Sequence, residues 1–380
     1  MKSFAFAKAW AKESALPLWS GVGFDMARGL FHERLDFDRN PIALPATRLM
    51  VQARQIATFS RATLAGWHRG SETVLAACLA NVERLYHRAD GHPGWVFSID
   101  PNGKPASRVR DLYAHAFIVY ALAWSYRLTG DPHSIRLADE TLAEIDMVLA
   151  ASHGGHLDAA PSDDPTRRQN PHMHLLEAVL ALYEATGRER DLVRAGALVE
   201  LATSRFIDAE SGALLEDFTP DWKPLEPRGY NRVEPGHQFE WYWLFGEYRR
   251  LGGSVPEEVT DRLLDFGLDH GIDQESGLIV DAVTESGSIL NPSFRSWPHA
   301  EGVKAFVTAA KGGQEGAAQM ADHLLASLVT FCPDMLDGGW IDRFDADGAP
   351  AVDDMPASTL YHVMGALFEA ELLAGSERLG

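Results

Sequence analysis

The sequence predicts an all-α protein in which six helical hairpins form a closed ring, the (α/α)6 barrel. A short glycine-led motif recurs six times along the 380 residues. Pairs of segments with apolar residues three and four positions apart fill the intervals, a pattern typical of amphipathic helices. The motif glycines follow one another at intervals of 57 to 65 residues, at Gly29, Gly94, Gly155, Gly212, Gly277 and Gly339. Such a regular period indicates an array of similar units.

The helical segments can be placed from their periodicity and from their stop and cap signals. Gly130 and Asp131, for example, end one helix and begin the next. The predicted helices are 3–19, 48–69, 71–88, 111–129, 132–151, 169–186, 191–205, 235–250, 256–271, 298–311, 315–331 and 357–374. The glycine motifs contain β-prone runs and turn dipeptides such as Asn102-Gly103 and Asp347-Gly348. We therefore expect short β-hairpin-like loops at one end of the ring.

A pair of amphipathic helices cannot cover its own apolar face, so neighbouring pairs must stack. An open solenoid is the alternative to a ring. The first helix lacks a preceding partner and the last helix lacks a following one, and pairing these two closes the circle. No linker-like segment divides the chain, which predicts a single domain spanning residues 1–380.

The composition limits the possible partners and the cellular location. A net charge of -20 disfavours nucleic acid and anionic membranes, because both require a basic face. Cys78 and Cys332 are too few for a disulfide framework. Lys8 and Lys12 interrupt the first fifteen residues, and no run approaches the roughly 20 apolar residues of a membrane span. We expect a cytoplasmic monomer or homodimer that acts on a small molecule.

One polar residue follows each motif glycine at a similar distance. These residues, found 19 to 25 positions after the glycine, are Arg54, Tyr113, His174, His237, Glu301 and His362. Equal positions in successive repeats lie at equal heights around a ring. The sequence therefore predicts that these six side chains meet at one mouth of a central cavity.

Nearby residues extend this candidate site. Glu240 lies three residues after His237, so its carboxylate can hold the imidazole, as a catalytic or as a structural pair. Asn170 shares a helix face with His174, which favours His174 over the neighbouring His172, for which we expect a structural role.

Three larger side chains have both a functional and a structural interpretation. Arg54 lies on an apolar helix face, which is unfavourable unless an anionic or oxygen-rich group meets it. Trp297 and Trp340 offer flat surfaces for a sugar ring, but each is equally compatible with an aromatic core.

Two chemistries fit three histidines, a glutamate and an arginine. Neutral histidines can transfer protons at a carbon beside a carbonyl while Arg54 stabilises the oxyanion. Alternatively, His174, His237 and His362 bind a metal ion and Glu240 acts as the base of a metallohydrolase, although no compact ligand motif such as HExxH supports this. A glycosidase would require paired carboxylates. A ring that binds sugars or partners without turnover is a further alternative.

Seven motifs in order, RLMVQARQ, DLYAHAF, NPHMHLLEA, EPGHQFEWYWL, WPHAEG, GGWIDRF and TLYHVMGA, resemble the N-acylglucosamine 2-epimerase superfamily. The resemblance covers essentially the whole chain. It implies an (α/α)6 barrel and acid/base chemistry at C1 and C2 of a sugar without a metal ion or other cofactor. His174 and EPGHQFEW are similar to the mannose isomerase branch, which favours interconversion of D-mannose and D-fructose. A sugar 2-epimerase is the alternative.

The resemblance also implies roles for the candidate residues. His362 would take the C2 proton of the ring-opened aldose to give a cis-enediol, and His237, paired with Glu240, would return a proton at C1. His174 would assist ring opening and Arg54 would stabilise the enediolate. The residues expected to bind the substrate are Tyr113, Asn170, Trp297 and Glu301.

Overall fold

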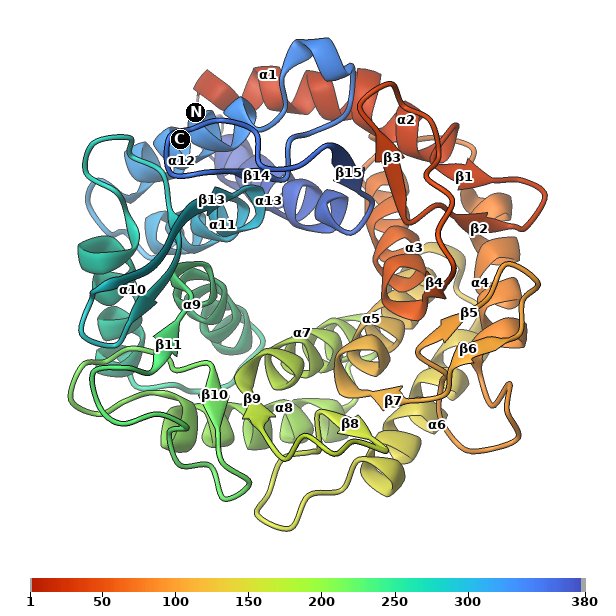
Figure 1. The fold of residues 1–380 in the computed structure, drawn as a ribbon, viewed down its shortest axis with the longest axis horizontal. Coiled ribbons are helices and arrows are strands. Elements are labelled where there is room, and N and C mark those ends of the chain that lie inside the picture. The colour runs from red at the N-terminus through yellow and green to blue at the C-terminus, as the bar shows by residue number, and fades with distance from the viewer. Residues whose placement is uncertain (1, 377–380) are drawn as a thin grey trace.

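The computed structural model describes residues 2–376 and consists mostly of helices, which confirms the predicted helical character (Figure 1). Six helices form an inner ring, in which each contacts the next and the last contacts the first. The inner helices are α3 (Leu49–Leu64), α5 (Leu112–Thr129), α7 (Gln169–Thr186), α9 (Pro235–Arg250), α11 (Ser296–Lys311) and α13 (Thr359–Ser376).

The remaining helices cover the outside of this ring (Figure 1). They are α4 (Glu72–Tyr86), α6 (Pro132–Val148), α8 (Glu189–Leu201), α10 (Glu257–Gly271) and α12 (Ala317–Thr330). The N-terminal segment occupies the sixth outer place, as α1 (Lys2–Trp10), a π-helical turn (Ala11–Ala15) and α2 (Leu16–Ser20). Helix α1 contacts both α12 and α13, so the two ends of the chain meet as expected for a closed ring. No helix in residues 2–376 is both long and apolar enough to cross a bilayer.

Local sequence signals explain where several helices begin and end. Gly130 adopts a left-handed conformation with φ of 70° and ends α5, and the Asp131 side chain accepts a hydrogen bond from the His133 amide at the start of α6. Helix α3 stops at Leu64, earlier than predicted, because the following residues turn through Gly66 and Gly70 at positive φ.

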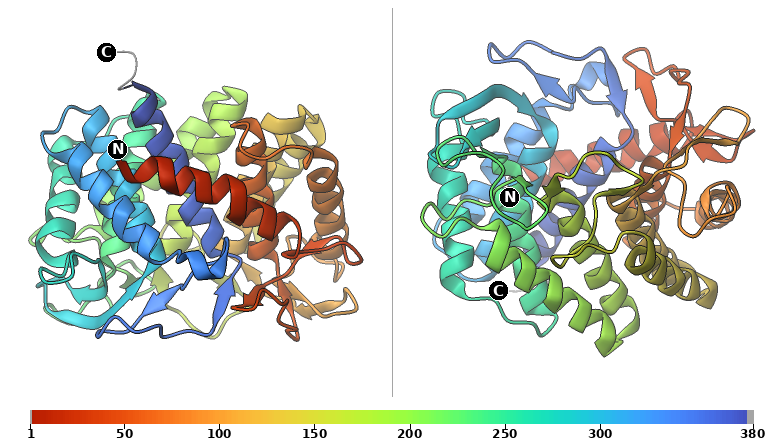
Figure 2. Two further views of the ribbon diagram at one scale, coloured as in Figure 1. Left: turned by 90° about the horizontal axis from the view of Figure 1, so that it is seen from above. Right: turned by 60° about the horizontal axis from the view of Figure 1, so that its bottom comes forward.

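Short strands join neighbouring repeats at one end of the ring (Figure 2). The strand that immediately precedes an inner helix pairs with a strand in the loop of the next repeat. These antiparallel pairs are β4 (Thr47–Arg48) with β5 (Ser98–Ile99), β7 (Arg110–Asp111) with β8 (Ala159–Ala160), β9 (Arg167–Arg168) with β10 (Asp217–Phe218), β11 (Arg232–Val233) with β12 (Val280–Thr284), β13 (Ile289–Arg295) with β14 (Arg343–Phe344), and β15 (Asp354–Pro356) with β3 (Arg34–Asp36). The pairs hold the N-terminal ends of the inner helices at the same end of the ring.

This pairing differs from the separate hairpin-like loops that the sequence predicts. Hairpins do occur, as β5 with β6 (Pro105–Ser107) and as β12 with β13, and β1 (Phe24–Asp25) pairs with β2 (Leu30–Phe31). The strand before each inner helix, however, lies beside the loop of the next repeat, which satisfies its backbone groups. Pairing between repeats cannot be read from the turn residues of a single loop.

A polar side chain in five of the inner helices anchors the loop of its own repeat. The imidazole Nε2 atoms of His115, His172 and His299 accept hydrogen bonds from loop amides at 2.9–3.0 Å, and Nδ1 of each contacts the carbonyl four residues earlier. Gln52 and Gln238 each bond both backbone groups of one loop residue. Burial lowers the pKa of the three histidines, which keeps them neutral. These contacts support the structural role predicted for His172.

The first and last segments of the chain pack closely where the ring closes. The rings of Trp19 and Trp340 stack with centroids 4.9 Å apart, and both side chains are buried, so Trp340 belongs to the core and offers no surface to a sugar. Gly338 lies against the N-terminal segment with φ of 94°, and a Cβ atom there would stand 2.6 Å from the backbone of Ser14. Only glycine permits this approach.

Substituting alanine at Gly338 tests this closure. Gly338→Ala should lower the free energy of unfolding by about 3 kcal/mol or more, because it adds a backbone clash to an unfavourable φ. Gly348→Ala is the matched control: Gly348 has φ of 79° but nothing within 4 Å of its Cβ position, so we expect a loss of only about 1 kcal/mol. Urea unfolding followed by circular dichroism measures both, and equal losses would contradict the close packing.

Candidate active site

The candidate residues lie in the first two turns of the inner helices, at the end of the ring where the strands pair. Their positions are Arg54 on α3, Tyr113 on α5, Asn170 and His174 on α7, His237 and Glu240 on α9, Trp297 and Glu301 on α11, and His362 on α13. The strand pairs place these helix ends together, so side chains far apart in sequence can meet.

Along the axis of the ring, the candidate residues lie at two heights about one helical turn apart. The heights are measured from the residues that anchor the loops, Gln52, His115, His172, Gln238 and His299. Arg54, His174, Glu240 and Glu301 each come two residues after such an anchor, whereas Tyr113, Asn170 and Trp297 come two residues before one. The predicted single height is therefore too simple. The spacing from the motif glycine is an imprecise measure because the loops before the helices differ in length.

Arg54 is a buried cation surrounded by aromatic rings. Its guanidinium donates hydrogen bonds to the Tyr113 hydroxyl and to the Ser358 carbonyl, and lies 4.3 Å from the ring centroid of Phe117 and 4.8 Å from that of Tyr361. Within residues 2–376 no carboxylate forms an ion pair with it. Arg54 can therefore stabilise negative charge that develops on a bound molecule.

His174 is held by a carboxylate on its own helix. Its Nδ1 atom lies 3.2 Å from Oε2 of Glu177, which also accepts a hydrogen bond from the Tyr361 hydroxyl. Burial lowers the pKa of His174 to about 4, so the imidazole is neutral and Nε2 is an acceptor. The edge of the Tyr113 ring packs on this imidazole at 4.8 Å between centroids. Glu177 was not predicted, although its three-residue spacing from His174 places both on one helix face.

His362 is a neutral imidazole oriented by Glu301. Its Nδ1 atom lies 2.7 Å from Oε1 of Glu301, whose other oxygen pairs with Lys304 at 2.6 Å. Burial, with the positive charges of Arg54 and Lys304, holds the pKa of His362 well below 6.5. With Nδ1–H donated to the carboxylate, Nε2 keeps a free lone pair and can act as a base.

His237 pairs with Glu216, and the predicted pairing with Glu240 is wrong. Nδ1 of His237 lies 2.9 Å from Oε1 of Glu216, because the imidazole sits in the first turn of α9, where the loop carrying Glu216 reaches it. Burial opposes the protonated imidazole, but the charges of Glu216 and Glu234 outweigh it and raise the pKa of His237 to about 9. His237 is therefore a cation at neutral pH and can act as an acid.

Glu240 is a buried carboxyl group whose nearest ion-pair partner is Nδ1 of His174, 3.9 Å from its Oε1 atom. Neither of its oxygens has a hydrogen-bond partner among the described residues. Burial, with repulsion by Glu301, raises its pKa well above 4.5. A carboxyl group kept neutral in this way can donate a hydrogen bond to an oxygen of a bound molecule. The Oδ1 atom of Asn170 is likewise buried and unpartnered.

Trp297 lies next to both the proposed acid and the proposed base of the site. Its ring centroid lies 4.8 Å from that of His237 and 5.7 Å from that of His362, so the indole lies beside both histidines. One carboxylate oxygen of Glu240, one of Glu301 and a ring nitrogen of His362 all lie within 4.8 Å of one another. The site thus combines an acid, a base, an unpaired cation and a flat aromatic surface.

Known proteins can now be compared with this arrangement. A family model described as N-acylglucosamine 2-epimerase matches residues 29–366. The chain belongs to this family. Membership identifies the protein as a sugar isomerase or epimerase, and the resemblance inferred from the seven motifs is confirmed.

Individual relatives of this epimerase-family enzyme include both kinds of activity. The mannose-6-phosphate isomerase of Rhizobium meliloti is 33% identical over 372 residues, which cover 95% of each chain. The cellobiose 2-epimerase of Bacteroides fragilis is 24% identical over 363 residues, covering 89% of this chain and 90% of that protein. A crystal structure of D-mannose isomerase has a TM-score of 0.86 at 20% identity, over 97% of both chains, and supports the fold.

The geometry does not favour the three-histidine metal site considered from the sequence. His174, His237 and His362 fall into three different groups of close-lying ligand atoms, and each group contains one histidine with two carboxylates. Within the described part of this epimerase-family enzyme, the three imidazoles therefore do not form one ligand set.

Neutralising Glu216 should shift the ionisation of His237. In Glu216→Gln the amide oxygen can still accept the Nδ1–H bond, but the negative charge is lost, so the His237 pKa should fall from about 9 toward 6.5. Histidine proton NMR across a pH titration measures this value. Glu275→Gln, at an exposed position, is the control.

The same pair should affect stability in a defined direction. The folded protein holds the His237 proton more tightly than the unfolded chain does. The pair therefore stabilises the fold below pH 6.5, and this contribution is lost as the pH rises through about 9. An unchanged His237 pKa in Glu216→Gln would contradict the assignment of Glu216 as its partner.

Proposed function

We propose that this enzyme interconverts D-mannose and D-fructose by proton transfer through a cis-enediol intermediate. One observation supports this most strongly: two buried histidines that both lie beside Trp297 are held in opposite protonation states. His362 is neutral and His237 is protonated, as judged by their pKa values, the first well below 6.5 and the second about 9. Environments that separate two pKa values in this way provide a base and an acid at the same pH.

The first half of the proposed reaction uses His362 and Arg54. Nε2 of His362 removes the C2 proton of the ring-opened aldose, and the C–H electron pair forms the C1–C2 double bond. Negative charge moves to the former carbonyl oxygen, where Arg54 stabilises it. The neutral carboxyl group of Glu240 can donate a further hydrogen bond to the enediol.

The second half decides the product. A proton delivered to C1 by His237, with transfer of the O2 proton to the negatively charged O1, gives the neutral ketose; His237 is left neutral and His362 keeps the proton taken from C2. His174 accepts a hydroxyl hydrogen through Nε2 during ring opening, and Tyr113, Asn170, Trp297 and Glu301 position the sugar or the groups that touch it. Glu301 acts mainly through His362, because it accepts the Nδ1–H bond of that imidazole.

A sugar 2-epimerase is the second candidate. The acid His237 and the base His362 both lie beside Trp297, so both are near one bound sugar, and a proton returned to the opposite face of C2 in place of C1 would invert that carbon. The relatives include a cellobiose 2-epimerase. Both reactions share the first half, and only the site of reprotonation differs.

The charge near the site favours a neutral sugar over a phosphorylated one. Arg295 pairs with Glu234 and Asp281, and Arg232 pairs with Asp217 and Glu234, so these cations are already neutralised. One relative is nevertheless named a mannose-6-phosphate isomerase, which makes the phosphorylated sugar the natural comparison. We also propose that the chain is one (α/α)6-barrel domain and that the reaction requires no metal ion; activity that disappears on chelation would contradict the latter.

Removing either histidine should abolish most turnover. His362→Ala and His237→Ala should each retain the helical circular dichroism spectrum and lose about 10²- to 10⁴-fold in kcat, the usual contribution of a positioned acid or base. Production of fructose from D-mannose, followed by proton NMR, measures the loss. His323→Ala, at an exposed position on α12, is the control and should retain full activity. Wild-type turnover in either active-site variant would contradict the assigned roles.

Incubation with D-mannose in D2O should separate the two candidate functions. We expect fructose to appear before glucose, with deuterium at C1 where the transferred proton has exchanged with solvent. Glucose appearing first would instead establish a 2-epimerase. D-mannose 6-phosphate serves as the parallel substrate, and we expect a lower kcat/KM for it because no unpaired cationic cluster meets its phosphate.

A further inference from the structure

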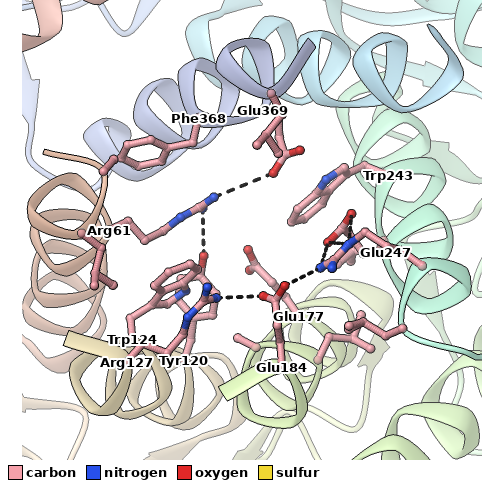
Figure 3. Close-up of a pocket in the computed structure, with 18 of the residues that line it drawn as sticks. Arg61, Tyr120, Trp124, Arg127, Glu177, Glu184, Trp243, Glu247, Phe368 and Glu369 are labelled. Carbon is pink, nitrogen blue, oxygen red and sulfur yellow. Dashed lines mark hydrogen bonds and ion pairs between the residues drawn. The ribbon is translucent and has the colours of Figure 1, made fainter. Parts of the chain in front are cut away.

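A second cavity lies inside the same ring at the end opposite to the strands (Figure 3). Its volume is about 430 Å³, within the roughly 300–1,000 Å³ of typical small-molecule pockets. Each inner helix contributes to its wall between its middle and its C-terminal end, through Arg61, Tyr120, Glu177, Trp243, Lys311 and Phe368 among others. None of these side chains belongs to the acid–base set proposed above.

The charged groups of this wall are matched in sign. Arg127 pairs with Glu184 at 2.8 Å, and Arg250 pairs with Glu184 at 2.9 Å and with Glu247 at 2.6 Å. Glu369 lies 3.8 Å from Arg61. The lining contains four basic and five acidic side chains, so a charged ligand of either sign finds no large excess of the opposite charge. Paired guanidinium and carboxylate groups favour a neutral ligand whose hydroxyls both donate and accept hydrogen bonds.

Two polar atoms in the wall are still available to a ligand. The indole Nε1 atom of Trp243 is a buried donor without an acceptor among the described residues, and the Trp243 side chain is only 6% exposed. Figure 3 shows the Trp243 indole projecting from α9 toward the middle of the cavity. Both hydrogen bonds that Glu177 accepts go to Oε2, so Oε1 is available to a ligand. Buried hydrogen-bond donors normally have an acceptor, so a buried donor without one suggests that a bound molecule supplies the acceptor.

We propose that this cavity is a second binding site, which takes a neutral polyhydroxylated small molecule such as a sugar or sugar alcohol. The flat indole and phenyl faces suit its C–H surfaces, and the Oε1 atom of Glu177 and the paired guanidinium and carboxylate groups suit its hydroxyls. Because Glu177 lines the cavity and also orients His174, a ligand bound here touches the carboxylate that holds an imidazole of the active site. The proposal does not depend on which reaction that site catalyses.

Indole NMR of the full chain can test this site directly. The ten tryptophans give ten separate Nε1–H signals in a protein labelled with ¹⁵N. The signals of Trp124, Trp243 and Trp297 are assigned from those lost in the corresponding Trp→Phe variants. Titration with D-mannitol, a neutral hexitol without a carbonyl to react, should shift the Trp124 and Trp243 signals to saturation. The buried Trp19, whose Nε1 is also unpartnered but lies outside the cavity, is the matched control and should not shift.

Two further titrations make the result decisive. In Trp297→Ala, which weakens the first site, the midpoint for Trp124 and Trp243 should stay unchanged. The proposal is overturned if that midpoint moves with the first site, or if neither signal shifts up to ~100 mM, a range that covers millimolar dissociation constants. Inorganic phosphate at the same concentrations should leave both signals in place, and equal shifts with phosphate would overturn the assignment of a neutral ligand. Failure of the proposed isomerase reaction would leave these shifts intact.

Discussion

Closure of the ring is the interaction on which the rest of the structure depends. Strand β15 pairs with β3, α13 contacts α3, and Gly338 lies against the backbone near Ser14, so the two ends of the chain form one continuous wall. The same contacts assemble the site. Arg54 donates to the Ser358 carbonyl across 304 residues of sequence and lies over the Tyr361 ring, next to His362. An open array of the same helices would leave this cation without its aromatic surroundings and the base without the positive charge that keeps it neutral.

Burial inside the closed ring then determines the protonation states. The same loss of hydration acts on His362 and His237, but the neighbouring charges differ: Arg54 and Lys304 lower the pKa of His362, whereas Glu216 and Glu234 raise that of His237. The six inner helices also point their N-terminal ends, which carry partial positive charge, at this end of the ring. That field favours negative charge, such as that of the proposed enediolate. At the other end the helix C-termini meet Arg61, Arg127, Arg250 and Lys311, whose charges suit the partial negative charge there.

The sequence was most informative where periodicity carries the information. The repeats and the helix pairs follow from local spacing. So does the placement of four site residues at one end of the ring, because the length of a helical turn and the length of a repeat determine their positions. These residues are Arg54, His174, Glu301 and His362. Glu216 could not be found in this way, since it reaches His237 from a loop of variable length. The recurring positions are also ambiguous by themselves: His115, His172 and His299 repeat as regularly as the site residues but anchor loops. Only the direction in which each side chain points separates the two sets.

Two buried side chains, Lys304 and Glu177, link the candidate active site to the second cavity, and this gives them their importance. Lys304 pairs with Glu301, which orients His362, and its Nζ atom also lies 3.4 Å from the ring centroid of Trp243 in the second cavity. Glu177 similarly contacts His174 on one side and lines the second cavity on the other. Glu177, which sets the tautomer of His174, can therefore be reached from the far end of the ring, and the fully buried Glu301 is connected to that end through Lys304 and Trp243. A change there would act on catalysis through the orientation and charge of these imidazoles, without any contact with the reacting sugar.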